Sequence, residues 1–222
     1  MKFWKVRKMT IKANIGCGKT PTAGWLNFDN SPALKLSRSP FRYWISKSLG
    51  LLSKEQIENI EWNKKNKINF ADATNVLPFN DGTVDYIYTS HMIEHLSRSG
   101  VESFLIDTLR VLKSGGIIRI SVPDLQLAIN TYAISKDADA FMESILVEAP
   151  PISSLKQKFR LLAVGYRHHQ WMYDGNSLIK LLKKIGYKNA EVCQPGHTNM
   201  SDPGGLNLYE RSDQSVYVEA IK

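Results

Sequence analysis

Apolar residues follow two alternating patterns along this chain. Residues 84–89 and 117–122 form short, mostly apolar runs, which are typical of strands buried on both faces of a sheet. Between them, residues 100–112 place apolar side chains on one helical stripe and are followed by Ser114-Gly115-Gly116, a helix-ending signal. Strands that alternate with helices favour an α/β fold with a mostly parallel sheet.

Two longer segments interrupt this alternation. Residues 32–66 contain the capping-box pattern that begins at Ser53, and residues 124–165 also have a helical pattern. We expect both segments to be helical insertions, after the second and the fifth strand. Residues 189–194 and 215–221 are predicted to pair as an antiparallel hairpin, because the loop between them lacks helical periodicity.

The length and composition of the chain favour one domain. With 222 residues and 43% hydrophobic residues, the chain can bury one substantial core but has little room for two. We therefore expect residues 1–222 to form a single domain.

A glycine turn followed by an acid is the strongest local signal for function. Gly16 and Gly18 follow the apolar run that ends at Ile15, and Asp29 follows the next predicted strand. Glycine allows the backbone to approach a ligand closely, and an ionised carboxylate at a strand tip can accept hydrogen bonds from both hydroxyls of a ribose. The pattern predicts an adenosine-containing cofactor across Gly16 to Asp29.

Three kinds of ligand site compete for these glycines. A dinucleotide fingerprint requires glycine at position 21, which is Pro21. A phosphate-binding loop would use Gly18-Lys19-Thr20, but Pro21 and Gly24 leave little room for the helix that such a loop opens. S-adenosylmethionine fits a site with two glycines and one acid. A nucleotide-binding protein using residues 18–20, and a turn that binds nothing, remain as alternatives.

Charge and cysteine content restrict the partners and the compartment. The formal net charge of +8 favours anionic partners, but the basic residues are scattered, which argues against nucleic acid. Cys17 and Cys193 form neither a disulfide framework nor a Cys-x-x-Cys pair, so we expect a cytoplasmic protein. No transmembrane segment is expected, although the basic leader at residues 1–9 would allow peripheral contact with a membrane.

In the order of its motifs, the chain resembles the class I S-adenosylmethionine-dependent methyltransferases. Residues 14–18, Asn-Ile-Gly-Cys-Gly, resemble their glycine-rich first motif, and Asp29 matches the acid that holds the ribose. Asp72-Ala73 falls where these enzymes contact adenine, and residues 90–96 resemble the segment that faces the methyl group. The cofactor implied by the resemblance is S-adenosyl-L-methionine, with the cofactor-binding residues Asn14, Gly16, Cys17, Gly18, Asp29, Asp72, Ala73 and Ser90.

The resemblance also implies a fold and a subgroup. The fold would be an α/β, three-layer, Rossmann-like, seven-stranded mostly parallel sheet with an antiparallel edge strand, and residues 215–222 resemble that closing strand. The block 168–174 and the entry 21–25 resemble a bacterial subgroup often encoded beside surface-polysaccharide biosynthesis enzymes. Most members place a full helix between the glycines and the ribose acid, whereas this chain has only about ten residues there.

Histidines are the candidate catalytic bases. Methyl transfer from a sulfonium is an in-line displacement, and an alcohol acceptor also needs a base that takes its proton. Histidine suits this role because it is largely neutral at cellular pH. The candidates are His91, His95, His168 and His169. We expect O-methylation of a small-molecule or glycan-type acceptor, and the sequence leaves a homodimer open.

One histidine pair allows another function. His91, Glu94 and His95 have the His-x-x-Glu-His spacing of a zinc peptidase, so a metal-dependent hydrolase is a further alternative. The helix that would carry them is short, since it follows a buried strand and Gly100 lies close behind it. We therefore expect no metal ligands, and each histidine could instead be a hydrogen-bonded wall residue.

Overall fold

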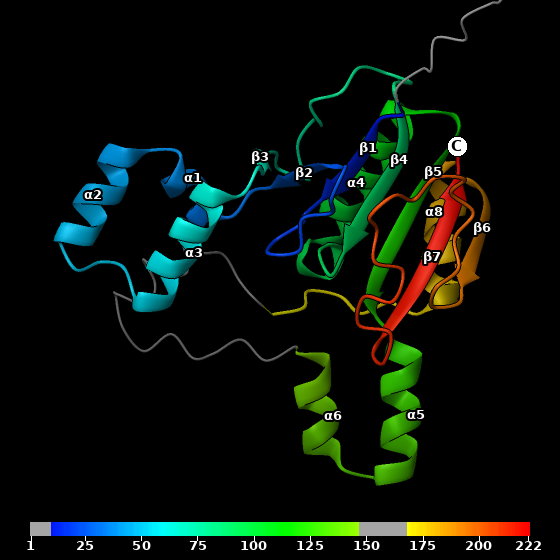
Figure 1. Cartoon of the computed structure of the whole chain (residues 1–222). Helices are drawn as coiled ribbons and strands as arrows, with labels where there is room; N and C mark the ends of the chain where they lie inside the picture. The colour runs from blue at the N-terminus through cyan, green and yellow to red at the C-terminus, as the bar shows by residue number, and fades with distance from the viewer. Residues whose placement is uncertain (1–9, 147–167) are drawn as a thin grey trace, which may run out of the picture.

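A mixed sheet forms the centre of the computed structural model, which describes residues 10–146 and 168–222. Its seven strands have the order β3-β2-β1-β4-β5-β7-β6 (Figure 1). β7 is antiparallel to both of its neighbours, and the other pairs are parallel. The strands are β1 (Lys12–Ile15), β2 (Leu26–Asp29), β3 (Asn69–Phe70), β4 (Val84–Ser90), β5 (Leu112–Pro123), β6 (Lys188–Cys193) and β7 (Ser215–Ile221).

The sheet confirms the predicted fold class. β5 and β7 are buried on both faces, and on one of them Ile118 pairs with Ala220 and Ile120 with Val218. The chain end does form the antiparallel strand that the resemblance implied. It lies one position inside the sheet, because β6 pairs with its outer side.

Two helices cover one face of this sheet. α4 (Arg98–Val111) buries Phe104 and Leu105, and α8 (Gly175–Ile185) buries Leu178 and Leu182, all in the same apolar core as the strands. α8 begins at a capping box on Asp174 and ends at Gly186, whose positive φ gives the left-handed cap. α4 thereby packs against β5, and α8 packs behind β6 and β7 (Figure 1).

The opposite face is covered by the long connection between β6 and β7, residues 194–214, which we call the β6–β7 loop. Met200 and Leu206 of this loop pack against Trp25, Tyr88 and Ile117. The resemblance implied a helix between β1 and β2, but the short connection here, residues 16–25, contains none. The third layer of the predicted fold is thus formed here by a loop.

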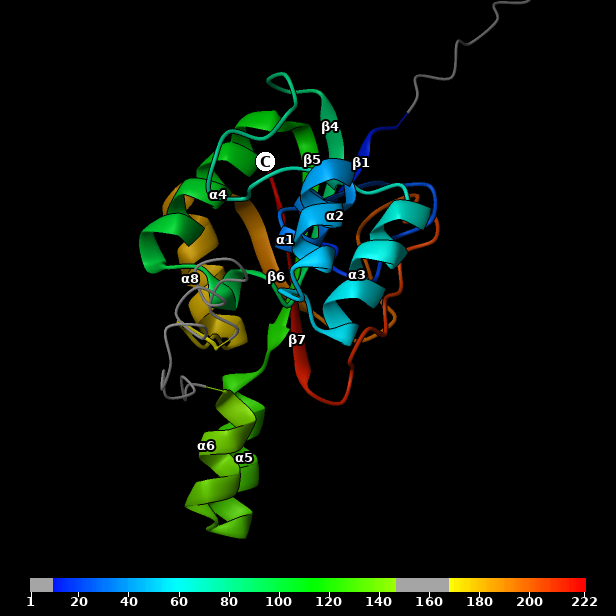
Figure 2. The same ribbon diagram turned by 90° about the vertical axis from the view of Figure 1, so that its left-hand side faces the viewer.

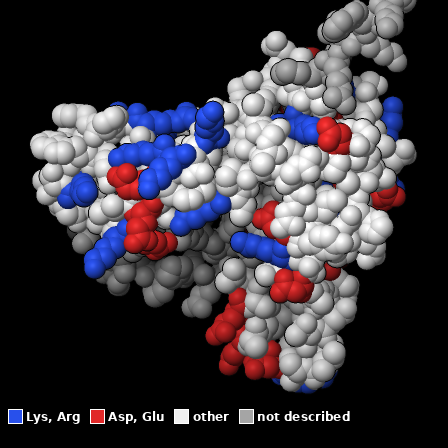
Figure 3. Space-filling model, in the orientation of Figure 1, with Lys and Arg blue, Asp and Glu red and all other residues white. Residues whose placement is uncertain are grey.

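The first predicted insertion lies beyond the β3 edge of the sheet (Figure 1). It consists of α1 (Pro32–Ser37), α2 (Pro40–Ser48) and α3 (Lys54–Lys65), and the predicted capping box at Ser53 is present. Cys17 joins this insertion to the sheet by packing with Leu34 and Ile68. Lysine and arginine side chains gather over these helices, whereas acidic side chains lie over α6 at the lower end of the molecule (Figure 3).

The second predicted insertion begins with a helical hairpin that projects away from the sheet (Figures 1 and 2). It is formed by α5 (Leu125–Ser135) and α6 (Ala138–Ile145). The rest of the range predicted to be helical, up to residue 165, lies outside the described residues, as does the leader at residues 1–9. Among the described helices, none is long and apolar enough to cross a membrane.

Two boundaries differ from the predictions. The helix expected to reach Leu112 ends at Val111, because Leu112 already has extended backbone angles and starts β5. Gly115 has a positive φ of 77°, but it lies inside β5 and does not cap the helix. The strand before Asp72 is only Asn69–Phe70, since the chain turns immediately at Asp72.

Candidate functional site

The carboxyl ends of four parallel strands bring most of the predicted site residues to one edge of the sheet. β1 leads into Gly16, β2 ends at Asp29, β3 precedes Asp72, and β4 ends at Ser90. The strand order reverses between β1 and β4, because β2 and β3 lie on one side and β5 on the other. In open α/β sheets, ligands bind at such a switch point.

The glycine turn at this point is tightly packed. Gly16 has a φ of 75°, and a Cβ atom on it would lie 2.5 Å from Met92 Cγ. The backbone amides of Gly16 and Cys17 both donate to Phe28 O, at 2.9 and 3.0 Å, which fixes the turn on β2. Gly18 also has a positive φ, but a Cβ atom there would meet nothing within 4 Å. Only Gly16 is therefore required for close approach.

Two aspartates lie at the ends of the paired strands β2 and β3. Asp29 Oδ2 accepts from Gly18 N at 3.0 Å and its Oδ1 accepts from Ser31 N at 2.7 Å. Asp29 O accepts from Ala71 N at 3.2 Å, which brings Asp72 next to it. Each oxygen of Asp29 keeps capacity for another hydrogen bond, as a ribose would require.

Asp72 is held in its ionised form. Burial opposes its ionisation, but hydrogen bonds from the amide and hydroxyl of Thr74 outweigh burial and lower the pKa of Asp72 below its ordinary value. The two distances to Asp72 Oδ1 are 2.9 and 2.8 Å. The adjacent Ala73 is buried in the core.

Two residues expected to bind the cofactor have mainly structural positions. Asn14 is buried, and its Nδ2 donates to Thr22 Oγ1 at 3.1 Å and to Asn27 Oδ1 at 3.2 Å. It thereby holds the turn between β1 and β2. The Cys17 side chain points into the first insertion, and burial raises the pKa of its thiol to about 12. Asn27, which sequence reasoning missed, completes this buried network.

The phosphate-loop alternative does not fit the geometry. Such a loop must open a helix whose first amides face the phosphates. In the described chain, the residues after Thr20 form a short turn that enters β2 at Leu26, and the amide of Thr20 itself donates to Cys17 O at 2.8 Å. Gly18-Lys19-Thr20 therefore lacks the helix that this function requires.

Histidines gather beyond the end of β4. His91 has a φ of 48°, and its Nε2 lies 2.8 Å from Ser215 Oγ. Arg211 donates to its Nδ1 at 3.1 Å, so this nitrogen is unprotonated. Burial, together with the positive charge of Arg211, lowers the pKa of His91 to about 4. His91 is therefore neutral at physiological pH.

Glu94 lies at the centre of the histidine cluster, on the single turn of 3₁₀ helix η1 (Ile93–His95). Its side chain is 1% exposed, and its Oε1 lies 3.5 Å from His91 Nδ1 and 4.0 Å from His95 Nε2. Burial raises the pKa of Glu94 to about 7. The zinc-peptidase alternative fails here, because His91 precedes this turn with left-handed backbone angles and no helix presents both histidines on one face.

The segment that enters α8 completes the cluster. His169 is buried, and its ring lies edge-on to that of His95, with 5.1 Å between centroids. Burial lowers the pKa of both histidines. His168 contributes its carbonyl oxygen, which lies 3.2 Å from His95 Nδ1. Of the four predicted histidines, the structure thus brings the side chains of three around Glu94.

Sequence reasoning missed the residues that the β6–β7 loop brings to this edge. Glu210 accepts from Tyr88 OH at 2.8 Å, and Thr20 Oγ1 lies 3.4 Å from its other oxygen. Arg211 contacts His91 as described. This loop has no periodic pattern, so the sequence contains no signal that it crosses the sheet to reach the glycine turn.

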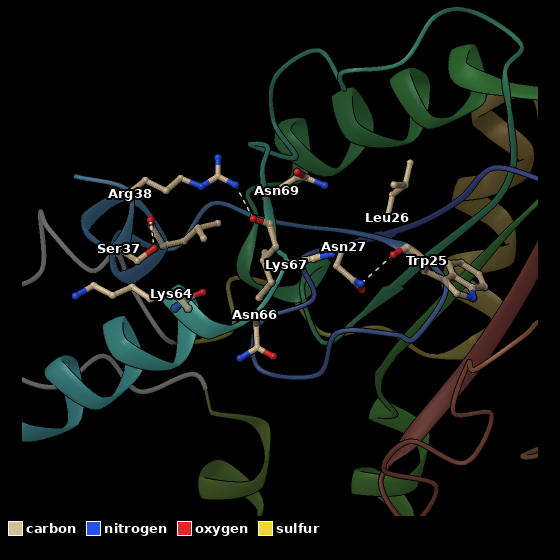
Figure 4. A pocket seen from close by; sticks show the side chains of 12 residues that line it. Trp25, Leu26, Asn27, Ser37, Arg38, Lys64, Asn66, Lys67 and Asn69 are labelled. Atoms are coloured by element: carbon tan, nitrogen blue, oxygen red, sulfur yellow. Dashed lines mark hydrogen bonds between the residues drawn. The ribbon is translucent and has the colours of Figure 1, made fainter. Parts of the chain in front are cut away.

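A hollow of about 610 Å³ lies elsewhere, between the start of β2 and the first insertion (Figure 4). Arg38 and Lys64 border it from the insertion, and Asn27 and Asn69 border it from the strands. None of the residues predicted to bind the cofactor or to act in catalysis lines it. The hollow is therefore separate from the candidate site at the switch point.

Residues 46–120 match the family model described as a methyltransferase domain. The matched part contains Asp72, Ala73, Ser90, His91 and His95, whereas the glycine turn and Asp29 precede it. This match confirms the expectation of a methyltransferase, the class whose donor is S-adenosylmethionine. No curated protein sequence matches the chain.

Solved structures confirm the fold. An S-adenosylmethionine-dependent methyltransferase from Thermotoga maritima is 15% identical with a TM-score of 0.50, covering 98% of this chain and 84% of that one. One from Archaeoglobus fulgidus is 14% identical with a TM-score of 0.50, covering 97% and 87%. A third, from Methanosarcina mazei, is 14% identical with the same TM-score, covering 95% and 91%.

Proposed function

We propose that this chain transfers the methyl group of S-adenosylmethionine to an oxygen atom of a small-molecule or glycan-type acceptor. One observation carries the proposal: the Gly16–Gly18 turn and the Asp29 carboxylate meet at the switch point between β1 and β4, joined by the hydrogen bond from Gly18 N to Asp29 Oδ2. A turn that contains two glycines next to a carboxylate is what an adenosyl group requires.

The donor would lie across the ends of β1, β2 and β3. Asp29 would accept hydrogen bonds from the ribose hydroxyls, and the adenine would lie near Asp72 and Ala73. The open space beside Gly18 would let the donor approach the backbone, while Gly16 and Asn14 would act through the turn that they hold. Ser90, at the end of β4, would border the methionine part of the donor.

The acceptor would lie next to the histidine cluster. Met92, which packs against Gly16, separates this cluster from the glycine turn by one side chain, so donor and acceptor sites are neighbours. The enzyme must mainly hold the acceptor in line with the methyl group. The neutral imidazoles of His95 and His169 support an oxygen acceptor, because an alcohol must lose a proton on methylation. The unprotonated nitrogen of His91 is already occupied by Arg211.

Calorimetry with S-adenosylhomocysteine and with ATP tests donor binding. We expect S-adenosylhomocysteine to bind and ATP not to bind. Asp29→Asn should weaken binding by at least ~10-fold, since hydrogen bonds to a charged group contribute about 1.5–3 kcal/mol. Asp139→Asn, a change at an exposed acid in α6, is the matched control and should leave affinity unchanged. Binding of ATP without binding of S-adenosylhomocysteine would refute the proposal.

Transfer of a labelled methyl group to sugar nucleotides and glycan fragments tests the acceptor class. The resemblance of residues 168–174 to the subgroup associated with surface polysaccharides supports this choice of panel. We expect one acceptor to be methylated on oxygen, and His95→Gln to lower turnover while S-adenosylhomocysteine binding persists. Methylation confined to amines would overturn the assignment of an oxygen acceptor.

A further inference from the structure

We propose that Glu94, His95 and His169 form a binding site for a divalent transition-metal ion. One ligand atom from each of these residues lies within 4.8 Å of the other two. They come from η1, after β4, and from the segment that enters α8. From the sequence we expected no metal ligands because the helix that carries Glu94 and His95 is short. The fold now brings His169 next to them.

Backbone carbonyls orient both imidazole rings. His95 Nδ1 lies 3.2 Å from His168 O, and His169 Nδ1 lies 2.8 Å from Ile145 O. A carbonyl can only accept, so each Nδ1 carries the proton and each Nε2 presents an unprotonated lone pair. Metal-ligating histidines show this same arrangement, in which the second ring nitrogen donates to a carbonyl. His95 Nε2 faces Glu94 Oε1 at 4.0 Å.

The Glu94 carboxylate lacks the partners that a buried charge requires. Both of its oxygens are buried, and neither accepts a hydrogen bond from any part of the chain that the structure describes. His91 Nδ1 lies 3.5 Å from Oε1, but it already accepts from Arg211 and has no proton to donate. Since ionised groups in protein interiors are paired or bind metals, this carboxylate points to a cation.

The two segments that carry these residues are joined without any ion. Glu94 O accepts from the amides of Gln170 and Trp171, at 2.7 and 3.2 Å. The Gln170 side chain donates to His95 O at 2.7 Å. The ligand set is thus preformed by backbone contacts, and binding an ion would require little rearrangement of the chain.

Two imidazole nitrogens and one carboxylate oxygen select the kind of ion. This set suits zinc and its neighbours among the transition metals, whereas calcium and magnesium prefer oxygen ligands alone. Three protein ligands leave a coordination position open. An ion there would hold and polarise an acceptor oxygen. This role rests on the proposed function, whereas the binding itself does not.

Metal titration of tag-free, chelator-treated protein tests the site. We expect one Zn²⁺ ion per chain and, with Co²⁺ as the probe, visible absorption bands from the bound ion. Glu94→Gln and His169→Gln should each weaken binding by at least ~10-fold, because even partners behind the ligands contribute 10–100-fold. His197→Gln is the matched control, because His197 is exposed on the β6–β7 loop, and it should leave binding unchanged.

Absence of binding at micromolar free zinc, or binding that Glu94→Gln leaves intact, would overturn the proposal. If the variants fail to fold, the wild-type protein can be treated with diethyl pyrocarbonate. The His95 side chain is 34% exposed, so we expect it to be labelled without zinc and protected with zinc. Equal labelling would also overturn the proposal. Neither measurement uses S-adenosylmethionine, so failure here leaves the calorimetric test of donor binding unaffected.

Discussion

Gly16→Ala is the sharpest test of how the glycine turn is built. Gly16 has a φ of 75°, and an added Cβ would lie 2.5 Å from Met92 Cγ and 2.9 Å from Met92 Cβ. Gly18→Ala is the matched control, because Gly18 also has a positive φ of 50° but open space around the added atom. The two variants share backbone strain and differ in the clash with Met92.

The costs of backbone strain and of the clash with Met92 predict different stabilities for the two variants. A left-handed backbone costs an L-residue roughly 1–2 kcal/mol, so Gly18→Ala should lose about that much stability. Overpacking adds about 1–3 kcal/mol, which gives roughly 2–5 kcal/mol for Gly16→Ala. For a chain of this size, each kcal/mol corresponds to a Tm shift of about 2–4 °C. Gly16→Ala should therefore melt clearly below Gly18→Ala.

Urea denaturation and thermal melting of both variants check this prediction. Adding Met92→Ala to Gly16→Ala should recover part of the loss, because Met92 Cγ is removed while its Cβ stays, and contacting residues couple by about 0.5–3 kcal/mol. Equal stabilities for Gly16→Ala and Gly18→Ala, with no coupling to Met92, would refute the close packing of Met92 against Gly16.

Three other perturbations test the buried ion pair, the buried thiols and the attachment of the β6–β7 loop. Arg119 is fully buried and pairs with Glu219 at 2.7 Å, so Glu219→Ala should cost about 3–5 kcal/mol in urea denaturation; a loss below ~1 kcal/mol would contradict this. Burial raises the pKa of Cys17 to about 12 and of Cys193 to about 11, from 9.0, so the folded state favours the protonated thiols. The contribution of the two thiols to the free energy of unfolding is present below pH 9 and falls as the pH rises toward 11 to 12. Alkylation of these thiols in the native protein at pH 8 should be slow, and rapid alkylation would disprove their burial. Glu210→Ala should raise hydrogen exchange across the β6–β7 loop, because two hydrogen-bond contacts to the sheet and the glycine turn are lost, and unchanged exchange would count against that anchoring.

The sheet and its helices were predictable because local sequence and global packing agree. α4 and α8 each combine an apolar stripe with a capping signal, so their residues specify both the helix and its buried face. β4 and β5 are largely buried on both faces, including Arg119 and Ser121 of β5, which is the pattern of central strands. Boundaries were less predictable, since Gly115 supplies a helix-ending signal that the fold uses inside a strand.

The sequence predicted only those parts of the candidate site in which the functional residue directly follows a strand. The turn at Gly16 and the acid at Asp29 belong to adjacent strands, so their proximity follows from strand order. The partnership of Glu94 with His169 depends on how residues 168–173 dock on η1, through amides that carry no side-chain information. No spacing rule could therefore identify it.

The short connection between β1 and β2 explains why residues near the end of the chain lie at the candidate site. No helix in this connection covers the apolar side chains of Trp25, Tyr88 and Ile117, and the β6–β7 loop packs over them instead. A hydrogen bond from Trp25 Nε1 to Pro203 O, at 3.0 Å, holds the loop there. The same loop then places Arg211 against His91. The loop therefore both covers the apolar face and contacts the histidine cluster, so a change that loosens the loop from Trp25 should alter both stability and the environment of the histidines.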